Sequence, residues 1–406
     1  MGRLLTAACL LAALAGAPAA RADGLDLSVD LRAVSSDATP SRLGGGLGKL
    51  RYDSTQEGLR LGYLRLGYRA DLSETMRVTA EAFAYGDHDV NALDLTELYL
   101  DWRPIPSSAW RSRVKLGAFY PEISMENRMR GWRSPYTLSF SAIDTWVGEE
   151  LRTIGAEYAL DWLGRSMGHS FEFSLNAALF GWNDPAGTVL GSRGWAIHDR
   201  QSTLFGRFAN RGAPLPERTV FYDEMDKRAG YYAGMSATWR GLVDFRYLHY
   251  DNRANLAAES DRIQDGAWET YFDSFGLRSA PDPHWTFIAQ WLHGRTWDDA
   301  ELPSNAWSYD SEYLLASYRT GAMRYSARYD RFWMLQTSST FIQYTGFYLA
   351  DRGHAWTLAV TRDLGEHWSA VLEGVRVDSW TAARTFTGEA RQQRENQLQL
   401  AIRYER

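Results

Sequence analysis

The chain has 406 residues, a formal net charge of −6 at pH 7 and one cysteine. The mildly acidic balance argues against nucleic acid as a partner, and a single cysteine excludes a disulfide framework. Aromatic residues make up 14% of the chain, and this abundance in an otherwise polar sequence favours the interfacial girdles of a membrane barrel.

The N-terminus has the three parts of a secretory signal. A charged start is followed by an apolar run and by a small-x-small cleavage site that ends at Ala22. We therefore predict a signal peptide over residues 1–22 and a single mature domain over residues 23–406. The only cysteine, Cys9, falls in the apolar run, and no later run of about 18 apolar residues is present to form a membrane helix.

From residue 25 onward, the chain alternates apolar and polar residues in segments of about ten. The segment 25–33 reads Leu-Asp-Leu-Ser-Val-Asp-Leu-Arg-Ala, with an apolar residue at every odd position. Such alternation presents one face to lipid and the other to water. We predict sixteen strands, at residues 25–34, 58–70, 74–87, 92–103, 111–120, 149–161, 168–182, 228–240, 241–251, 267–279, 284–297, 307–319, 321–333, 353–363, 367–379 and 394–405.

The connections between these segments alternate in length, as in an outer-membrane barrel with short periplasmic turns and long outer loops. Residues 341–350 have the composition of another strand, and we assign them to an outer loop because a seventeenth strand would break the parity. A soluble β-sandwich is the competing architecture. The short connections are predicted at residues 71–73, 104–110, 161–167, 241, 280–283, 320 and 364–366, with longer ones between them except at residues 87–91.

The last predicted strand shows which side chains should face the lipid. Its even positions are mostly large and apolar, and its odd positions are mostly polar. The predicted lipid-facing set is Leu398, Leu400, Ile402 and Tyr404, and the predicted water-facing set is Gln397, Gln399, Ala401 and Arg403.

Motifs of catalysis and metal binding are missing from the sequence. The glycine-rich stretch 44–50 lacks the spacing of a phosphate-binding loop. The eight histidines are scattered singly, without the spacing of a zinc pair, and no G-x-S-x-G nucleophile elbow occurs. We therefore predict no catalytic residue, no metal and no cofactor.

Residues 115–158, 354–384 and 395–406 resemble porin-like proteins related to the phosphate-selective porin family of Gram-negative bacteria. The resemblance implies a sixteen-stranded, usually trimeric channel with a long inward-folded loop and basic residues along the pore. The chain departs from that family in its shortage of lysine, of which it has only three, and in its last residue, Arg406, where an aromatic is usual.

Residues 121–148 are predicted to form a constriction loop. Their content of tryptophan, phenylalanine, leucine and methionine suits burial, and the lumen of a barrel of this size is the available volume. Opposed charges at the constriction would select small polar solutes by charge and size, although the loop could instead pack against the wall without selecting solutes. The predicted constriction residues are Arg128, Arg130, Arg133, Glu149, Glu150 and Arg152.

Alternation also predicts which charged side chains line the pore wall. Positive and negative residues are nearly balanced, and almost all positive charge is arginine, which suits a fixed anion-attracting surface. The predicted wall residues are Arg113, Lys115, Glu81, Glu157, Glu172, Asp244, Arg246, Arg324, Arg328, Asp330 and Arg403.

We conclude from the sequence that the protein is an outer-membrane porin that passively conducts small hydrophilic solutes with a weak anion preference, surrounded by outer-membrane lipid and lipopolysaccharide. One alternative is an outer-membrane enzyme such as a phospholipase, which needs a histidine within hydrogen-bond reach of an outward serine. Another is a surface-binding barrel with an occluded lumen.

Overall fold

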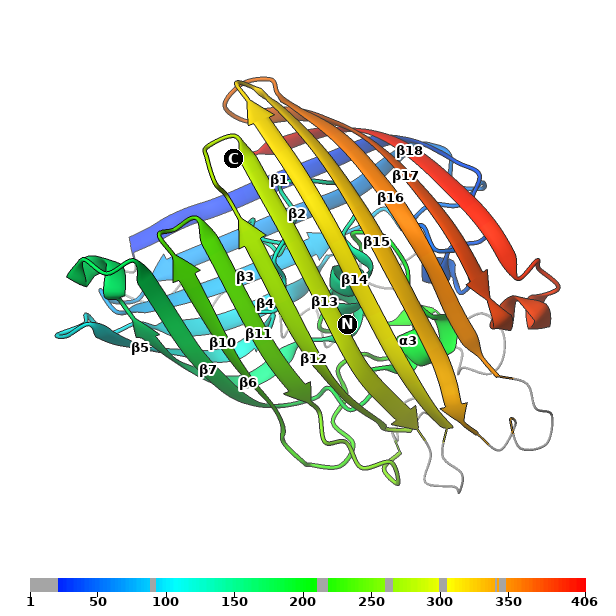
Figure 1. Ribbon diagram of the computed structural model, residues 1–406, viewed down its shortest axis with the longest axis horizontal. Coiled ribbons are helices and arrows are strands. Elements are labelled where there is room, and N and C mark those ends of the chain that lie inside the picture. The colour runs from blue at the N-terminus through cyan, green and yellow to red at the C-terminus, as the bar shows by residue number, and fades with distance from the viewer. Residues whose placement is uncertain are drawn as a thin grey trace.

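The computed structural model describes residues 21–87, 93–209, 218–259, 266–298, 305–339, 342 and 348–406. Within these residues, sixteen antiparallel strands close into one barrel, and the first strand, β1 (Arg21–Ser36), pairs with the last, β18 (Gln392–Glu405) (Figure 1). Closure leaves no unpaired strand edge, which a membrane-spanning sheet requires. The predicted strand number is confirmed.

The remaining barrel strands follow one another around the ring in chain order, and all sixteen predicted segments overlap an observed strand. A separate two-stranded sheet, β8–β9, lies in an outer connection. The bounds are β2 (Gly58–Asp71), β3 (Met76–Ala84), β4 (Asp94–Trp102), β5 (Trp110–Phe119), β6 (Thr153–Trp162), β7 (Phe171–Gly181), β8 (Phe208–Ala209), β9 (Arg218–Thr219), β10 (Gly230–Trp239), β11 (Val243–Asp251), β12 (Trp268–Ser279), β13 (Trp285–Asp298), β14 (Asn305–Thr320), β15 (Met323–Ser338), β16 (Ala350–Asp363) and β17 (Trp368–Thr381).

Connection lengths alternate as predicted. Short turns lie along the upper and left edges of Figure 1, and the longer connections gather at the other end of the barrel. The 3-10 helix η2 (Gly164–Met167) lies in a short turn, and the 3-10 helix η3 (Ala382–Thr387) follows β17 at the long-loop end. None of the described helices has the length and apolar character needed to cross a membrane.

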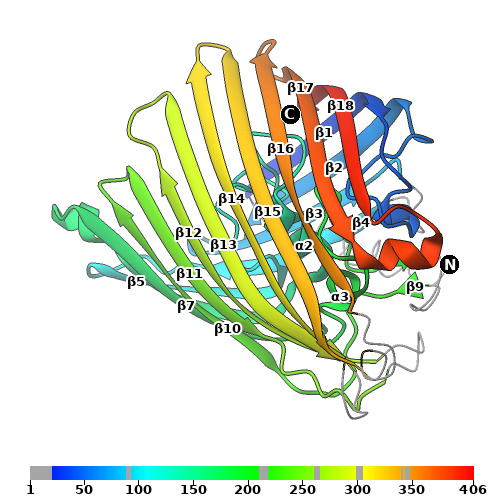
Figure 2. The same cartoon turned by 45° about the vertical axis from the view of Figure 1, so that its right-hand side comes forward.

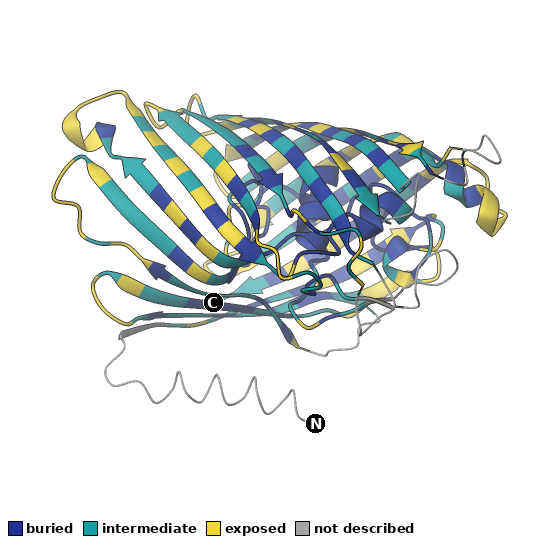
Figure 3. Cartoon of the chain, turned by 90° about the horizontal axis from the view of Figure 1, so that it is seen from below, coloured by how far each residue is buried: buried dark blue, intermediate teal, exposed yellow. Residues whose placement is uncertain are grey.

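Burial alternates along each strand, so the barrel has an outer face and a lumenal face (Figure 3). In β18, Leu398 is 53% exposed and Leu400 is 48% exposed, whereas Gln399 is 1% exposed. The predicted facing of this strand is therefore confirmed. Because the exposed positions are rich in leucine and tryptophan, this outer face suits contact with lipid.

The lumenal face is covered by three outer connections that fold inward. They are residues 37–57, which contain the 3-10 helix η1 (Arg42–Gly44), residues 120–152, and the described parts of the connection after β7, residues 182–209 and 218–229. Figure 2 shows helices α2 (Ala142–Glu150) and α3 (Thr188–Arg193) inside the ring of strands. The expected inward fold of the constriction loop is observed, but two further connections share the lumen with it.

Two local predictions were wrong. The stretch before β6 showed no helical period in the sequence, yet residues 142–150 form α2, and the strand predicted from residue 149 begins at Thr153. All nine helix residues are buried. The helix therefore has no face exposed to water, and its sequence shows no amphipathic pattern. Ser141 caps the helix by accepting a hydrogen bond from the Asp144 backbone N–H.

Several predictions fall wholly or partly outside the described residues. Residues 1–20 of the predicted signal peptide lie there, as do residues 88–92 and most of the segment 341–350. Ala350, at the end of that segment, begins β16.

The lipid-facing assignment predicts a strong position effect on stability. Leu400→Arg should lower the free energy of unfolding by about 2–4 kcal/mol, because it places a guanidinium in the apolar band. Leu59→Arg is the matched control, since Leu59 is 84% exposed at the outer end of β2 and should cost about 0–1 kcal/mol. Urea unfolding in lipid vesicles measures both, and equal losses would show that Leu400 does not lie in the band.

Candidate functional site

Residues 121–133, here called the crossbar, span the lumen from one wall to the opposite wall. Arg128 Nη1 lies 3.2 Å from Asp244 Oδ2 on β11, and Arg130 pairs with Asp26 on β1. Strands β1 and β11 are eight positions apart in the ring of sixteen, so they face each other across the barrel. Two neighbouring loop arginines therefore reach opposite walls, and the lumen is divided at this level.

Contacts with several strands hold the crossbar in place. The Met125 N–H donates to Gln290 of β13 at 3.2 Å, and Arg246 of β11 donates to the Ser124 carbonyl at 2.9 Å. On the other side, Arg133 binds Glu405 of β18 at 2.7 Å and the Tyr63 hydroxyl of β2 at 2.6 Å. Because both sides are anchored, the crossbar is not a free flap.

The segment after the crossbar, residues 134–141, is bound to the wall by Arg328 of β15. This guanidinium donates to the carbonyls of Ser139 at 2.8 Å and Phe140 at 2.6 Å. It also pairs with Glu126 at 3.1 Å and with Asp330 at 2.8 Å. These four contacts, and a fifth with the Thr137 hydroxyl at 3.1 Å, are buried. Arg328 thus replaces the water that these carbonyls and carboxylates would otherwise bind.

Acidic groups outnumber basic ones around Arg328. The carboxylates of Glu126, Asp144, Asp330 and Glu373 are all fully buried, and Glu373 accepts the N–H groups of Leu138 and Ser139. Burial, and then the negative charge of Glu126, hold the pKa of Asp144 well above its ordinary value. Burial therefore favours the neutral form of the Asp144 carboxyl.

Glu150 joins the second and third inward connections. Its carboxylate accepts the N–H groups of Val189 at 2.8 Å and Leu190 at 3.0 Å, at the N-terminal end of α3, and the Trp146 indole N–H at 2.7 Å. These donors are neutral, and burial raises the pKa of Glu150 from its ordinary value of 4.5 to about 7. We therefore expect the contact between α2 and α3 to depend on pH.

Glu149 joins the first and third connections to α2. It pairs with Arg42 of η1, and His198 Nε2 lies 2.9 Å from Glu149 Oε1. The Arg200 N–H donates to His198 Nδ1, which places the ring proton of a neutral imidazole on Nε2, toward Glu149.

Asp199 is the centre of a further buried charge network. It accepts from Arg51 Nη1 at 2.8 Å and from Arg32 Nη1 at 3.2 Å. Arg32 also binds Asp30 at 2.6 Å, and Asp30 accepts from Arg403 at 2.7 Å. Asp199 thus ties two inward connections to β1, and Asp30 extends the network to β18.

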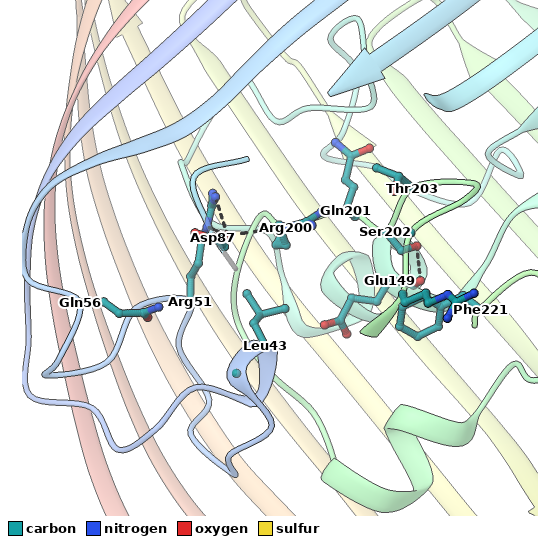
Figure 4. Close-up of a pocket in the computed structure, with 13 residues that line it drawn as sticks. Leu43, Arg51, Gln56, Asp87, Glu149, Arg200, Gln201, Ser202, Thr203 and Phe221 are labelled. Atoms are coloured by element: carbon teal, nitrogen blue, oxygen red, sulfur yellow. Dashed lines mark hydrogen bonds and ion pairs between the residues drawn. The ribbon is translucent and has the colours of Figure 1, made fainter. Parts of the chain in front are cut away.

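A small pocket of about 60 Å³ lies between the three inward connections (Figure 4). Arg51, Arg200 and Glu149 contribute charge to its lining, and Gln201 contributes an amide. The Gln201 Nε2 donates to the Gly131 carbonyl at 2.9 Å, so this side chain separates the pocket from the crossbar. A volume of this size holds about two water molecules, which is too little for a solute.

The structure places all eleven predicted wall residues on the lumenal face, and most of them bind a residue of opposite charge. Glu157, for example, lies 3.7 Å from Lys115, and Glu122 of the crossbar pairs with Arg113 at 2.8 Å and Lys115 at 3.0 Å. Glu157 also accepts from the neutral Tyr232 hydroxyl at 2.7 Å. Arg165 lies 3.7 Å from Glu172 near the periplasmic end. Glu81 pairs with Arg65 at 2.7 Å, and the Arg324 guanidinium lies 5.2 Å from the centre of the Tyr136 ring.

The predicted grouping of the constriction residues was wrong. Arg128, Arg130 and Arg133 pair with wall carboxylates, and in the described residues none of them pairs with Glu149 or Glu150. The two glutamates instead hold the inward connections together nearer the outer end of the lumen. Arg152 is buried, donates to the Ser202 carbonyl at 2.8 Å and stacks 3.5 Å from the centre of the Tyr120 ring.

Sequence reasoning missed several lumenal residues. Asp26, Asp30 and Arg32 lie at polar positions of the alternating segment 25–33, so the period-2 pattern could have identified them. Ser141 and Asp144 have the Ser-x-x-Asp spacing of a helix start, which was the available signal for α2. Nothing in the local sequence marks Asp199 or Gln201, whose partners are far away in the chain.

The enzyme alternative requires a histidine beside an outward serine. On the outer face, His249 Nδ1 lies 3.0 Å from Asp273, and His293 Nδ1 lies 3.0 Å from Asp310. Within the described part of the chain, no histidine side chain hydrogen-bonds to a serine. The geometry that this alternative needs is therefore not found among those residues.

One group of three carboxylates in the described residues has the geometry of a metal site. Oxygen atoms of Asp184, Glu224 and Asp226 lie within 4.8 Å of one another. Their oxygens already accept backbone N–H groups, including Lys227 to Glu224 at 2.7 Å and Arg228 to Asp226 at 2.7 Å. These loop contacts account for the cluster without an ion.

No protein-family model matches the chain, and no curated protein matches it. Solved structures do resemble it. The outer membrane channel DcaP of Acinetobacter baumannii has 10% identity and a TM-score of 0.57, over 95% of this chain and 97% of that chain. An anion-selective porin from Comamonas acidovorans has 12% identity and a TM-score of 0.53, over 96% and 100%.

The OmpF protein of Salmonella typhi, solved with daunomycin, has 10% identity and a TM-score of 0.51, over 94% of this chain and 97% of that chain. Identities this low establish the fold alone. That fold, with its closed sheet and apolar outer face, is an outer-membrane β-barrel, and it places the chain in an outer membrane.

The buried environment of Arg328 predicts that its loss releases the loop. Arg328→Gln should lower the free energy of unfolding by about 3–5 kcal/mol, because Glu126 and Asp330 remain buried without their cation. It should also expose residues 121–152 to protease. Arg331→Gln is the control, since Arg331 points outward on the same strand with a side chain 65% exposed and should change stability by about 0–1 kcal/mol. Equal effects would exclude the role given to Arg328.

The raised pKa of Glu150 leads us to predict that the contact between α2 and α3 depends on pH. Since its pKa is raised in the docked state, protonation stabilises docking, and this contribution is lost as pH rises from its ordinary pKa through about 7. Amide hydrogen exchange at residues 142–150, corrected for the chemical rate, should be faster at about pH 8 than at about pH 5. Glu150→Gln should remove the difference, while Glu74→Gln, in an exposed turn, should keep it. A difference that survives Glu150→Gln would assign the pH effect to another group.

Proposed function

We propose that the protein is a channel for small hydrophilic solutes with a weak preference for anions. The observation that carries this proposal is the crossbar, which presents two arginines to the lumen. The Arg128 side chain is 44% exposed and the Arg130 side chain is 41% exposed, so both guanidiniums meet water while their partners neutralise them only in part. Fixed positive charge at a narrow section attracts anions more strongly than the same charge in an open vestibule.

The fold supports a channel, since a barrel of this size has a lumen wide enough for water and solutes. The likeness to an anion-selective porin is consistent with the charge preference. The phosphate-selective family and a homotrimeric assembly stay predictions from the sequence resemblance.

A non-conducting barrel is the second candidate, and the packing of the upper lumen favours it. Wall residues such as Arg32, Glu81 and Thr357 are at most 1% exposed because inward connections cover them. In this case the protein would act through its outer loops. A conducting path would then require movement of the connections around the pocket in Figure 4.

Planar-bilayer recording tests the channel and its selectivity together. Under a salt gradient, the unaltered protein should show a reversal potential on the anion side, and the double variant Arg128→Gln/Arg130→Gln should shift it toward zero or toward cations. Raising the salt concentration should weaken the preference of the unaltered protein, because the Debye length shrinks.

The control removes the same charge outside the lumen. Arg331→Gln/Arg352→Gln alters two exposed arginines of the outer face and should leave the reversal potential unchanged. If both double variants shift it equally, the crossbar does not determine selectivity. If folded protein inserts without conducting, the channel is excluded and the non-conducting barrel remains.

A further inference from the structure

The lipid-facing surface over β16, β17 and β18 contains a groove, here called the acyl groove. Its floor is Gly374, which pairs with Leu358 on one side and Leu398 on the other. These leucines are 60% and 53% exposed, and a Cβ at Gly374 would meet only one atom, Leu398 Cδ1 at 3.9 Å. The groove that includes this position has a volume of about 760 Å³.

Charged residues close the outer end of the acyl groove. Arg376 follows Gly374 on the same face of β17, and its Nε lies 3.2 Å from Asp378. Arg394 of β18 binds the same carboxylate at 2.8 Å, and His354 Nε2 lies 3.9 Å from it. Asp378 thus pairs with two guanidiniums, while Asp37, the other carboxylate that lines the groove, accepts from the backbone N–H and the side-chain amide of Asn396.

A second opening lies beside this cluster and adds to the positive charge. Its volume is about 640 Å³, and Arg331, Trp333, Arg352 and Trp380 are among its lining residues. Arg352 lies 5.1 Å from the centre of the Trp380 ring, and within the described residues no carboxylate pairs with it. The combination of aromatic rings and arginines is typical of a membrane interface.

The cluster lies near the outer edge of the apolar band, where long side chains can reach lipid headgroups. Arg376 is eight residues beyond Trp368 at the periplasmic end of β17, which is about 26 Å along the strand and about 20 Å along the membrane normal at a tilt of about 40°. The apolar band of such barrels is about 25 Å tall. An exposed arginine at this depth needs an anionic headgroup, because a lipid tail cannot solvate it.

We propose that this surface binds an acylated, phosphate-bearing lipid of the outer leaflet. An acyl chain lies along Gly374 between Leu358 and Leu398, and a headgroup phosphate binds Arg376 and Arg394. The two guanidiniums can bind phosphate because Asp378 neutralises only one positive charge of the pair. The site is on the outside of the barrel, so it is independent of conduction through the lumen.

Native mass spectrometry of the detergent-solubilised protein tests the proposal with diphosphorylated lipid A as the probe. The unaltered protein should bind it, and Arg376→Gln/Arg394→Gln should weaken binding about tenfold. Gly374→Leu should weaken it similarly by filling the acyl groove.

Arg103→Gln/Arg319→Gln is the control, since it removes two exposed arginines at the periplasmic end and should leave affinity unchanged. Heat-modifiable gel migration verifies that each variant is folded.

Further probes distinguish the sources of the phosphate. Dephosphorylated lipid A and phosphatidylglycerol should both bind more weakly than the probe, and inorganic phosphate should fail to displace it. Displacement by inorganic phosphate together with normal binding by Gly374→Leu would mean a free-anion site and overturn the proposal. Unaltered lipid binding by Arg376→Gln/Arg394→Gln would also overturn the proposal. If that variant changed only in oligomeric state, the occupant of the groove would be a second copy of the chain, and the proposal would be wrong.

Discussion

The buried guanidinium of Arg328 is the contact on which the filled lumen most depends. A loop inside a barrel brings backbone carbonyls and N–H groups away from water, and each must find a partner. Arg328 of β15 supplies donors to two loop carbonyls and to two carboxylates at once, while Glu373 of β17, two strands away, accepts loop N–H groups. Side chains of the wall thus supply the hydrogen-bond partners that the loop backbone lacks, as a neighbouring strand does for a strand in a sheet.

Arginine suits this role better than lysine. Its planar guanidinium offers five donors in fixed directions and stays charged even when buried. Arg32, Arg51 and Arg328 each bind more than one acceptor. Lys49, which is also fully buried, donates from its one ammonium nitrogen to Asp351 at 2.6 Å and more weakly to the Arg193 carbonyl at 3.4 Å. The shortage of lysine, which the sequence linked to anion attraction, therefore also serves the internal packing of the barrel.

The sequence predicted the wall well and the lumen poorly, for a physical reason. A strand between lipid and water alternates with period 2, so segments such as 25–33 and the last strand reveal both their extent and their facing. A loop buried on all sides has no such period, and α2 was missed although Ser141 and Asp144 marked its start. Partners such as Arg130 and Asp26 meet only because the ring places β1 opposite β11, which no local pattern records.

The anchoring of the crossbar also has a consequence for the order of folding. Arg133 binds Glu405, 272 residues later in the chain, in the strand that closes the ring. The crossbar therefore cannot reach its final position until the last strand has paired with the first. Contacts of such long sequence separation form late, after a large loss of chain entropy. An open sheet carrying an undocked apolar loop must precede the native barrel, and this intermediate is the form that assembly factors or chaperones would have to protect.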